Sequence, residues 1–95
     1  MAKLDDLKGK VVWITGASSG LGKALAQECA LQGAQVVLTA RRFEELENVR
    51  VSLLNPDQHV SIPADITDES QVRHAYETVL ECKGRIDWLV NNAGL

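Results

Sequence analysis

The strongest constraint on the fold is a glycine-rich segment, TGASSGLG at residues 15–22, which joins two stretches of different periodicity. Residues 11–15 are all β-branched or aromatic, which is typical of a buried strand, and the run ends at a glycine. Leu21, Leu25 and Cys29 then recur at the four-residue spacing of a helix. Because glycine permits positive φ and the first amides of a helix lack intrahelical partners, this junction predicts a site for an anion such as pyrophosphate.

Strand and helix signals alternate along the rest of the chain. Further strands are predicted at residues 36–39, 59–63 and 86–90. Two more helices are predicted from apolar residues at helical spacing, Phe43, Leu46, Val49 and Leu53 in one, and Val72, Ala75, Tyr76, Val79 and Leu80 in the other. Short connections between alternating strands and helices require a parallel sheet with right-handed crossovers. The predicted fold is therefore α/β, a partial Rossmann-type doubly wound sheet with strand order 3-2-1-4.

Several side chains receive structural expectations. Asp68 is the predicted start of the last helix, with Gln71 capping it reciprocally, and Pro63 is expected where the third strand ends. Tyr76 is expected to pack in the core. The remaining candidates for chemistry are expected to be structural or solvated: His59, His74, Cys29 and Cys82. No metal site is expected, because their spacing matches no metal-ligand pattern.

Length and charge exclude several classes of protein. With 95 residues the chain makes one small domain. A net charge of −3 argues against a general grip on nucleic acid, which needs clustered basic charge. No apolar run approaches the ~20 residues that a transmembrane segment needs, and no targeting signal is visible. A cytoplasmic location is the default expectation.

The end of the second predicted strand indicates which cofactor is bound. An acidic residue there hydrogen-bonds the ribose 2′-OH of NAD, whereas arginine accommodates a 2′-phosphate. The sequence has Arg41 and Arg42 at this place. Arg41 comes first after the strand and is the predicted phosphate contact, with Ser18 as the candidate hydroxyl partner and Arg42 as a looser second charge. The predicted cofactor is therefore NADP(H). The alternative interpretation is a solvated helix start, with both arginines paired to Glu44 and Glu45.

Three motifs in order resemble the short-chain dehydrogenase/reductase family: residues 15–22, Asp65-Ile66, and Asn-Asn-Ala-Gly at residues 91–94. The resemblance extends from about residue 7 to the end. It implies that Asp65 accepts a hydrogen bond from the adenine amino group, whereas Asp65 taken alone is interpreted as a turn cap. It also implies that the backbone at Ile66 lies beside the ring and that Asn91 ties the sheet together. The implied cofactor-binding residues are Gly16, Ser18, Ser19, Gly20, Leu21, Gly22, Arg41, Arg42, Asp65, Ile66, Asn92, Ala93 and Gly94.

Members of this family exchange a hydride with nicotinamide to reduce carbonyls or oxidise alcohols, using a Tyr-x-x-x-Lys pair assisted by Ser and Asn. Tyr76 is the only tyrosine here, and Leu80 stands where the lysine would be. No catalytic residue is assigned. Residues 1–95 are expected to be the truncated, cofactor-binding part of an NADP(H)-dependent oxidoreductase, without its catalytic C-terminal half and with negligible turnover.

The alternative function is a non-catalytic nucleotide-binding or interaction module that pairs with a full-length relative. The fourth predicted strand has no later strand beside it, so its outer edge is expected to be bare. Unpaired backbone groups on an apolar edge favour association with another chain.

Overall fold

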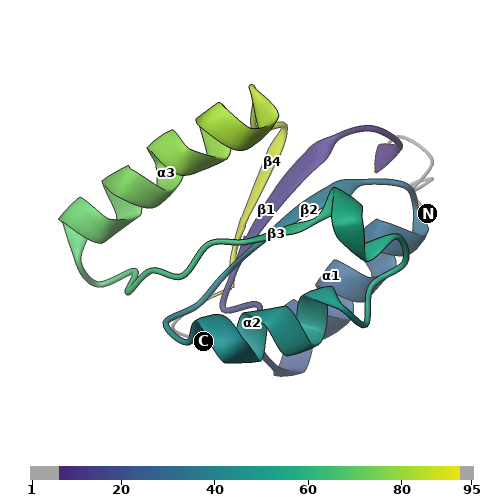
Figure 1. The fold of residues 1–95 in the computed structure, drawn as a ribbon, viewed down its shortest axis with the longest axis horizontal. Coiled ribbons are helices and arrows are strands. Elements are labelled where there is room, and N and C mark those ends of the chain that lie inside the picture. Colours follow the sequence, from purple (N-terminus) through teal and green to yellow (C-terminus); the bar gives the residue numbers. More distant parts are fainter. Residues whose placement is uncertain (1–6, 93–95) are drawn as a thin grey trace.

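The computed structural model describes residues 7–92, which form a four-stranded parallel sheet between two helical layers. The strands are β1 (Val11–Thr15), β2 (Gln35–Thr39), β3 (Val60–Ser61) and β4 (Trp88–Asn91). The helices are α1 (Gly20–Leu31), α2 (Phe43–Arg50) and α3 (Glu69–Lys83), with a 3-10 turn, η2 (Pro56–Gln58), before β3. Helices α1 and α2 cover one face and α3 the other (Figure 1). The strand order is β3-β2-β1-β4, which confirms the predicted α/β class and topology.

Each face of the sheet has its own core, because alternate residues of a strand point to opposite faces. Val12 and Ile14 of β1 belong to the core under α1 and α2. Val11 and Trp13 belong to the core under α3. Trp13 lies opposite Val37 in β2, and its indole Nε1 donates a buried hydrogen bond to Thr39 Oγ1 at 2.8 Å. Burial on both faces explains why β1 is an almost continuous apolar run.

Strand β3 is shorter than the predicted span of residues 59–63. At its start the acceptor for β2 is the His59 ring and not a backbone carbonyl, since Val36 N–H donates to His59 Nδ1 at 3.0 Å. At its end Pro63 has no N–H to give. His59 Nε2 lies 2.7 Å from Leu54 O, and burial lowers the pKa of the imidazole, with the charges of Lys83 and Arg50 acting the same way. His59 is therefore a structural residue, as expected.

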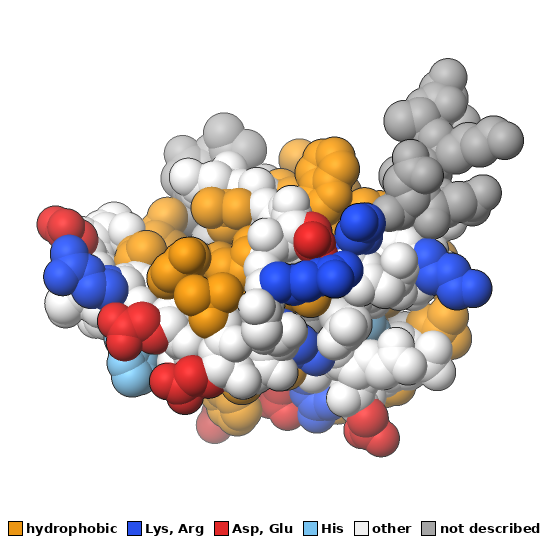
Figure 2. Space-filling model, turned by 90° about the horizontal axis from the view of Figure 1, so that it is seen from above, with side chains coloured by type: hydrophobic (Ala, Val, Ile, Leu, Met, Phe, Trp, Pro, Cys, Tyr) orange, Lys and Arg blue, Asp and Glu red, His pale blue; other side chains and the backbone are white. Residues whose placement is uncertain are grey.

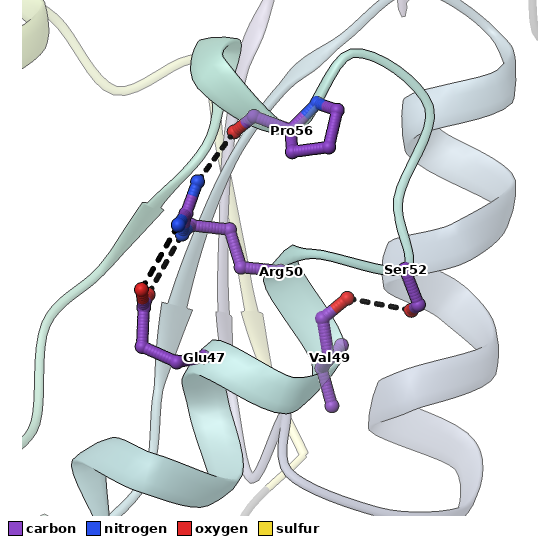
Figure 3. A network of polar contacts seen from close by, with 5 residues as sticks. All are labelled: Glu47, Val49, Arg50, Ser52 and Pro56. Atoms are coloured by element: carbon purple, nitrogen blue, oxygen red, sulfur yellow. Dashed lines mark hydrogen bonds and ion pairs between the residues drawn. The ribbon is translucent and has the colours of Figure 1, made fainter.

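Helix α2 ends at Arg50, three residues before the predicted apolar face ends. Ser52 N–H and Oγ both donate to Val49 O, which tightens the chain into a turn. Arg50 holds the segment that follows: its Nε and Nη2 donate to the Glu47 carboxylate at 2.7 and 2.9 Å, and its Nη1 donates to Pro56 O at 3.0 Å (Figure 3). Leu53 is still buried, although it lies outside the helix.

Helix α3 begins as predicted, but its capping differs in one detail. The Asp68 carboxylate accepts from the N–H groups of Ser70 and Gln71, so Asp68 is the N-cap. The Gln71 side chain does return to Asp68, but through its amide nitrogen, which donates to Asp68 Oδ2 at 3.1 Å. Its amide oxygen accepts from Asp65 N–H at 2.8 Å. The helix therefore fixes the Asp65 backbone directly.

Three apolar positions on the predicted helical faces are exposed, among them Phe43 at the start of α2. Tyr76 is 48% exposed, so the expectation that it packs in the core is wrong; only Ala75 and Val79 of the α3 stripe are fully buried. Leu21 is also exposed, at the start of α1. Of the two free cysteines, Cys29 is buried and Cys82 exposed. Within residues 7–92, no helix combines the length and apolar character needed to cross a membrane.

Candidate functional site

The carboxyl ends of β1, β2 and β3 lie at the same end of the parallel sheet, and the glycine-rich loop leaves β1 there. Gly16 and Gly20 have φ values of 63° and 57°, in the left-handed region that favours glycine. The loop is anchored to β2 because Ala17 N–H donates to Thr39 O at 3.2 Å. Ser19 is the N-cap of α1, yet its side chain makes no capping bond. The first amides of α1 thus remain available for an anion.

Gly22 lets α1 approach this loop closely. A Cβ atom at Gly22 would lie 2.1 Å from Gly16 O and 2.7 Å from Asn92 Nδ2. Neither contact is sterically tolerable, and Gly16 O is a backbone atom that cannot swing aside. The third glycine of the loop is therefore required by packing between the helix and the loop.

Asn91, the last residue of β4, and Asn92 directly after it hold the loop from the other side. Thr15 Oγ1 donates to Asn91 Oδ1 at 3.0 Å and accepts from Asn92 N–H at 3.1 Å. Asn92 Nδ2 donates to Gly16 O at 3.2 Å. Asn91 joins β1 and β4 as its expected role requires. Asn92 also reaches the loop, and Ala93 and Gly94 lie outside the described residues.

Beside the loop lies a hollow of about 410 Å³, called here the larger hollow. It is lined by Gly16, Ala40, Arg41, Ala64, Asp65, Ile66 and Thr67. Asp65 Oδ1 accepts from Thr67 N–H and Oγ1 at 2.9 and 2.6 Å, so this residue does cap a turn. These bonds, helped by the charge of Arg41, lower the pKa of the Asp65 carboxyl. Asp65 is thus a carboxylate at neutral pH, and Oδ2 makes no hydrogen bond to other described residues.

A second hollow of about 240 Å³, the smaller hollow, is lined by Ser18, Ala40, Arg41, Arg42 and Glu45. Arg41 lines both hollows, which places them next to each other. Arg42 Nη1 lies 3.3 Å from Glu45 Oε2, so the solvated-helix interpretation describes Arg42. Arg41 forms no ion pair with any residue between 7 and 92. Arg42 is therefore paired with a carboxylate and Arg41 is not, which agrees with the expectation that Arg41 is the main phosphate contact and Arg42 a looser second charge.

The structure thus brings several predicted residues together at the carboxyl end of the sheet: Gly16, Ser18, Arg41, Arg42, Asp65 and Ile66. The other predicted residues of the loop, Ser19, Gly20, Leu21 and Gly22, open α1 beside them. Four lining residues were not predicted from the sequence: Ala40, Ala64, Thr67 and Glu45. The Asp-x-Thr spacing signals a turn that would have included Thr67. Glu45 was considered only as a partner that would neutralise the arginines.

A parallel sheet in this order, with a glycine-rich turn opening a helix after its first strand, defines a Rossmann-type α/β protein. The family profile described as short chain dehydrogenase matches residues 10–95. The chain belongs to this family of oxidoreductases, whose members bind nicotinamide dinucleotides.

The relatives and solved structures agree on this family. A dehydrogenase/reductase SDR family protein 7-like from Anopheles gambiae is 48% identical, over 94% of this chain and 30% of its own length. A short-chain type dehydrogenase/reductase from Mycobacterium marinum superposes with a TM-score of 0.89 at 39% identity, covering 97% of this chain and 38% of that one.

A 3-ketoacyl-(acyl-carrier-protein) reductase from Brucella melitensis, solved with NADH, superposes with a TM-score of 0.81 at 37% identity, covering 87% and 33%. The chain spans about 30% of the length of the curated relatives it matches.

Proposed function

We propose that this chain binds NADP(H), and that it serves as the cofactor-binding part of an oxidoreductase acting on carbonyls or alcohols. The observation that carries the proposal is the position of Arg41, which lines both hollows beside the glycine-rich loop. Adenosine would occupy the larger hollow and the 2′-phosphate the smaller one. The pyrophosphate would then meet the first amides of α1.

The chemistry of both hollows fits this assignment. The larger hollow is lined by Ile66, an apolar residue, and by the ionised Asp65. Asp65 Oδ2 can accept a hydrogen bond from an adenine amino group. The smaller hollow offers two guanidinium groups and the Ser18 hydroxyl. Arginine binds phosphate with strong, charge-assisted hydrogen bonds. The sequence has no acidic residue directly after β2 to accept the ribose 2′-OH of NAD.

Titration of the 95-residue chain by calorimetry tests the proposal. NADPH should bind at least about tenfold more tightly than NADH, since a charge-assisted hydrogen bond contributes about 1.5 kcal/mol or more. The same preference should separate 2′,5′-ADP from 5′-AMP, because both ligands contain only the adenosine end. Circular dichroism should first establish that the chain is folded. Absence of heat with every nucleotide, or equal affinity within each pair, would contradict the assignment.

A specific observation favours a second property, association through β4. Among the described residues β4 pairs only with β1, and its Trp88 and Leu89 are 56% and 58% exposed. Leu89 continues into an apolar groove of about 440 Å³ between the sheet and α3, with Trp13 and Tyr76 in its lining. Figure 2 shows hydrophobic side chains exposed together on this side of the molecule. We propose that a second chain pairs with this edge.

Light scattering of the purified chain should then show species larger than a monomer. Leu89→Lys should shift the population toward monomer, because a charge on an edge strand opposes strand pairing. Leu31→Lys is the matched control: Leu31 is similarly exposed, but it ends α1 on the other side of the sheet. A monodisperse wild-type monomer, or equal shifts from both variants, would argue against association at β4.

A further inference from the structure

The smaller hollow contains a charge that opposes its proposed ligand. Of the residues that line it, Glu45 alone carries negative charge, and it lies one turn along α2 from Arg42. Its Oε2 is 3.3 Å from Arg42 Nη1. The carboxylate therefore occupies part of the hydrogen-bonding capacity of one of the two guanidinium groups that face the hollow.

The geometry of this pair is that of a weak contact. A single N···O distance is within range, and the two side chains are 80% and 47% exposed. Glu47 and Arg50, in the same helix, make a two-bond pair at 2.7 and 2.9 Å by comparison. Exposed single-contact pairs are screened by solvent and contribute little to stability. The Arg42–Glu45 pair can therefore open when a stronger anion arrives.

The first turn of α2 would otherwise suit an anion. Arg42 is the N-cap of α2, and its side chain makes no capping bond. The positive end of the helix dipole favours negative charge here, and Glu44 and Glu45 already supply it. A phosphate entering the smaller hollow has to compete with Glu45 both for Arg42 and for this end of the helix.

We infer that Glu45 is a specificity-determining residue, which lowers the affinity of the smaller hollow for a 2′-phosphate by holding Arg42. The inference rests on the proposed NADP(H) function. Arg41 forms no ion pair among residues 7–92, although the charge of Asp65 acts on it, and it provides the constant part of the attraction. Arg42 provides a part that is released only when its pair with Glu45 opens. The chain thus prefers NADP(H) less strongly than two free arginines would allow.

Glu45→Gln tests this inference in the 95-residue chain, with 2′,5′-ADP and 5′-AMP titrated by calorimetry. The variant should bind 2′,5′-ADP about 2- to 5-fold more tightly, which lies within the range expected for an exposed ion pair. Binding of 5′-AMP should stay within about 1.5-fold of wild type. Glu44→Gln is the matched control, because Glu44 lies exposed in the same turn and lines neither hollow. An equal gain in both variants would reduce the effect to net charge and overturn the inference, as would weaker binding by Glu45→Gln.

A second background separates competition for Arg42 from direct repulsion of the phosphate. In Arg42→Ala the gain from Glu45→Gln should fall below about 1.5-fold, since no guanidinium is left to release. A gain that persists would overturn the proposed mechanism. Failure of the NADP(H) function itself has a different signature: wild-type protein would then fail to distinguish 2′,5′-ADP from 5′-AMP at all.

Discussion

Replacing Arg41 with alanine should weaken NADPH binding by about 10- to 150-fold, the range for one charge-assisted hydrogen bond of about 1.5–3 kcal/mol. NADH lacks the 2′-phosphate, so its affinity should change by less than about threefold. The difference arises because Arg41 lines both hollows and has no ion-pair partner among residues 7–92. Calorimetric titration of both reduced coenzymes measures it directly.

Arg73→Ala is the control for this prediction. Arg73 is also an exposed arginine, but it lies on α3 and lines neither hollow. Its removal should leave both affinities nearly unchanged. Equal losses of NADPH and NADH in Arg41→Ala would mean that Arg41 supports the loop or the adenosine and does not bind a 2′-phosphate.

The sequence was sufficient to predict the order of elements, because each depends on local periodicity. The residues of β1 are buried on both faces, and the stop signal of each element lies within a few residues of its end. Strand β3 and the end of α2 were predicted less well. In both places a side chain forms a hydrogen bond with a backbone group: the His59 ring accepts from Val36 N–H, and the Arg50 guanidinium donates to Pro56 O. Such exchanges depend on tertiary contacts that periodicity does not encode.

The candidate site, like the fold, was predicted only in part. The loop glycines and the arginines after β2 could be identified from their positions between predicted elements. Arg41 could also be preferred over Arg42 from its place directly after the strand. Which arginine is paired could not be predicted, because both lie within helical reach of Glu45 and only the structure shows that Glu45 lies beside Arg42. The exposure of Tyr76 was not predicted either, because the apolar stripe of α3 is wider than the surface that covers it among the described residues.

Gly22→Ala should have the largest effect on stability. The added Cβ would lie 2.1 Å from Gly16 O, so α1 or the loop must move. Overpacking of this kind costs about 1–3 kcal/mol, and a clash with backbone belongs at the upper end of that range. For a domain of this size, a loss of about 3 kcal/mol lowers the melting temperature by about 12–24 °C. Urea and thermal unfolding followed by circular dichroism would measure both quantities.

Gly84→Ala provides the comparison that isolates the steric cause. Gly84 ends α3 with φ of 79°, and a Cβ there would have no atom within 4 Å. Alanine at this position costs only the strain of a left-handed backbone, about 1–2 kcal/mol, and leaves the loop intact. Gly22→Ala should therefore lose more stability than Gly84→Ala and should also bind both coenzymes more weakly at a temperature where it is folded. If the two variants were equally stable and equally able to bind, close packing at Gly22 would not be what shapes the phosphate loop.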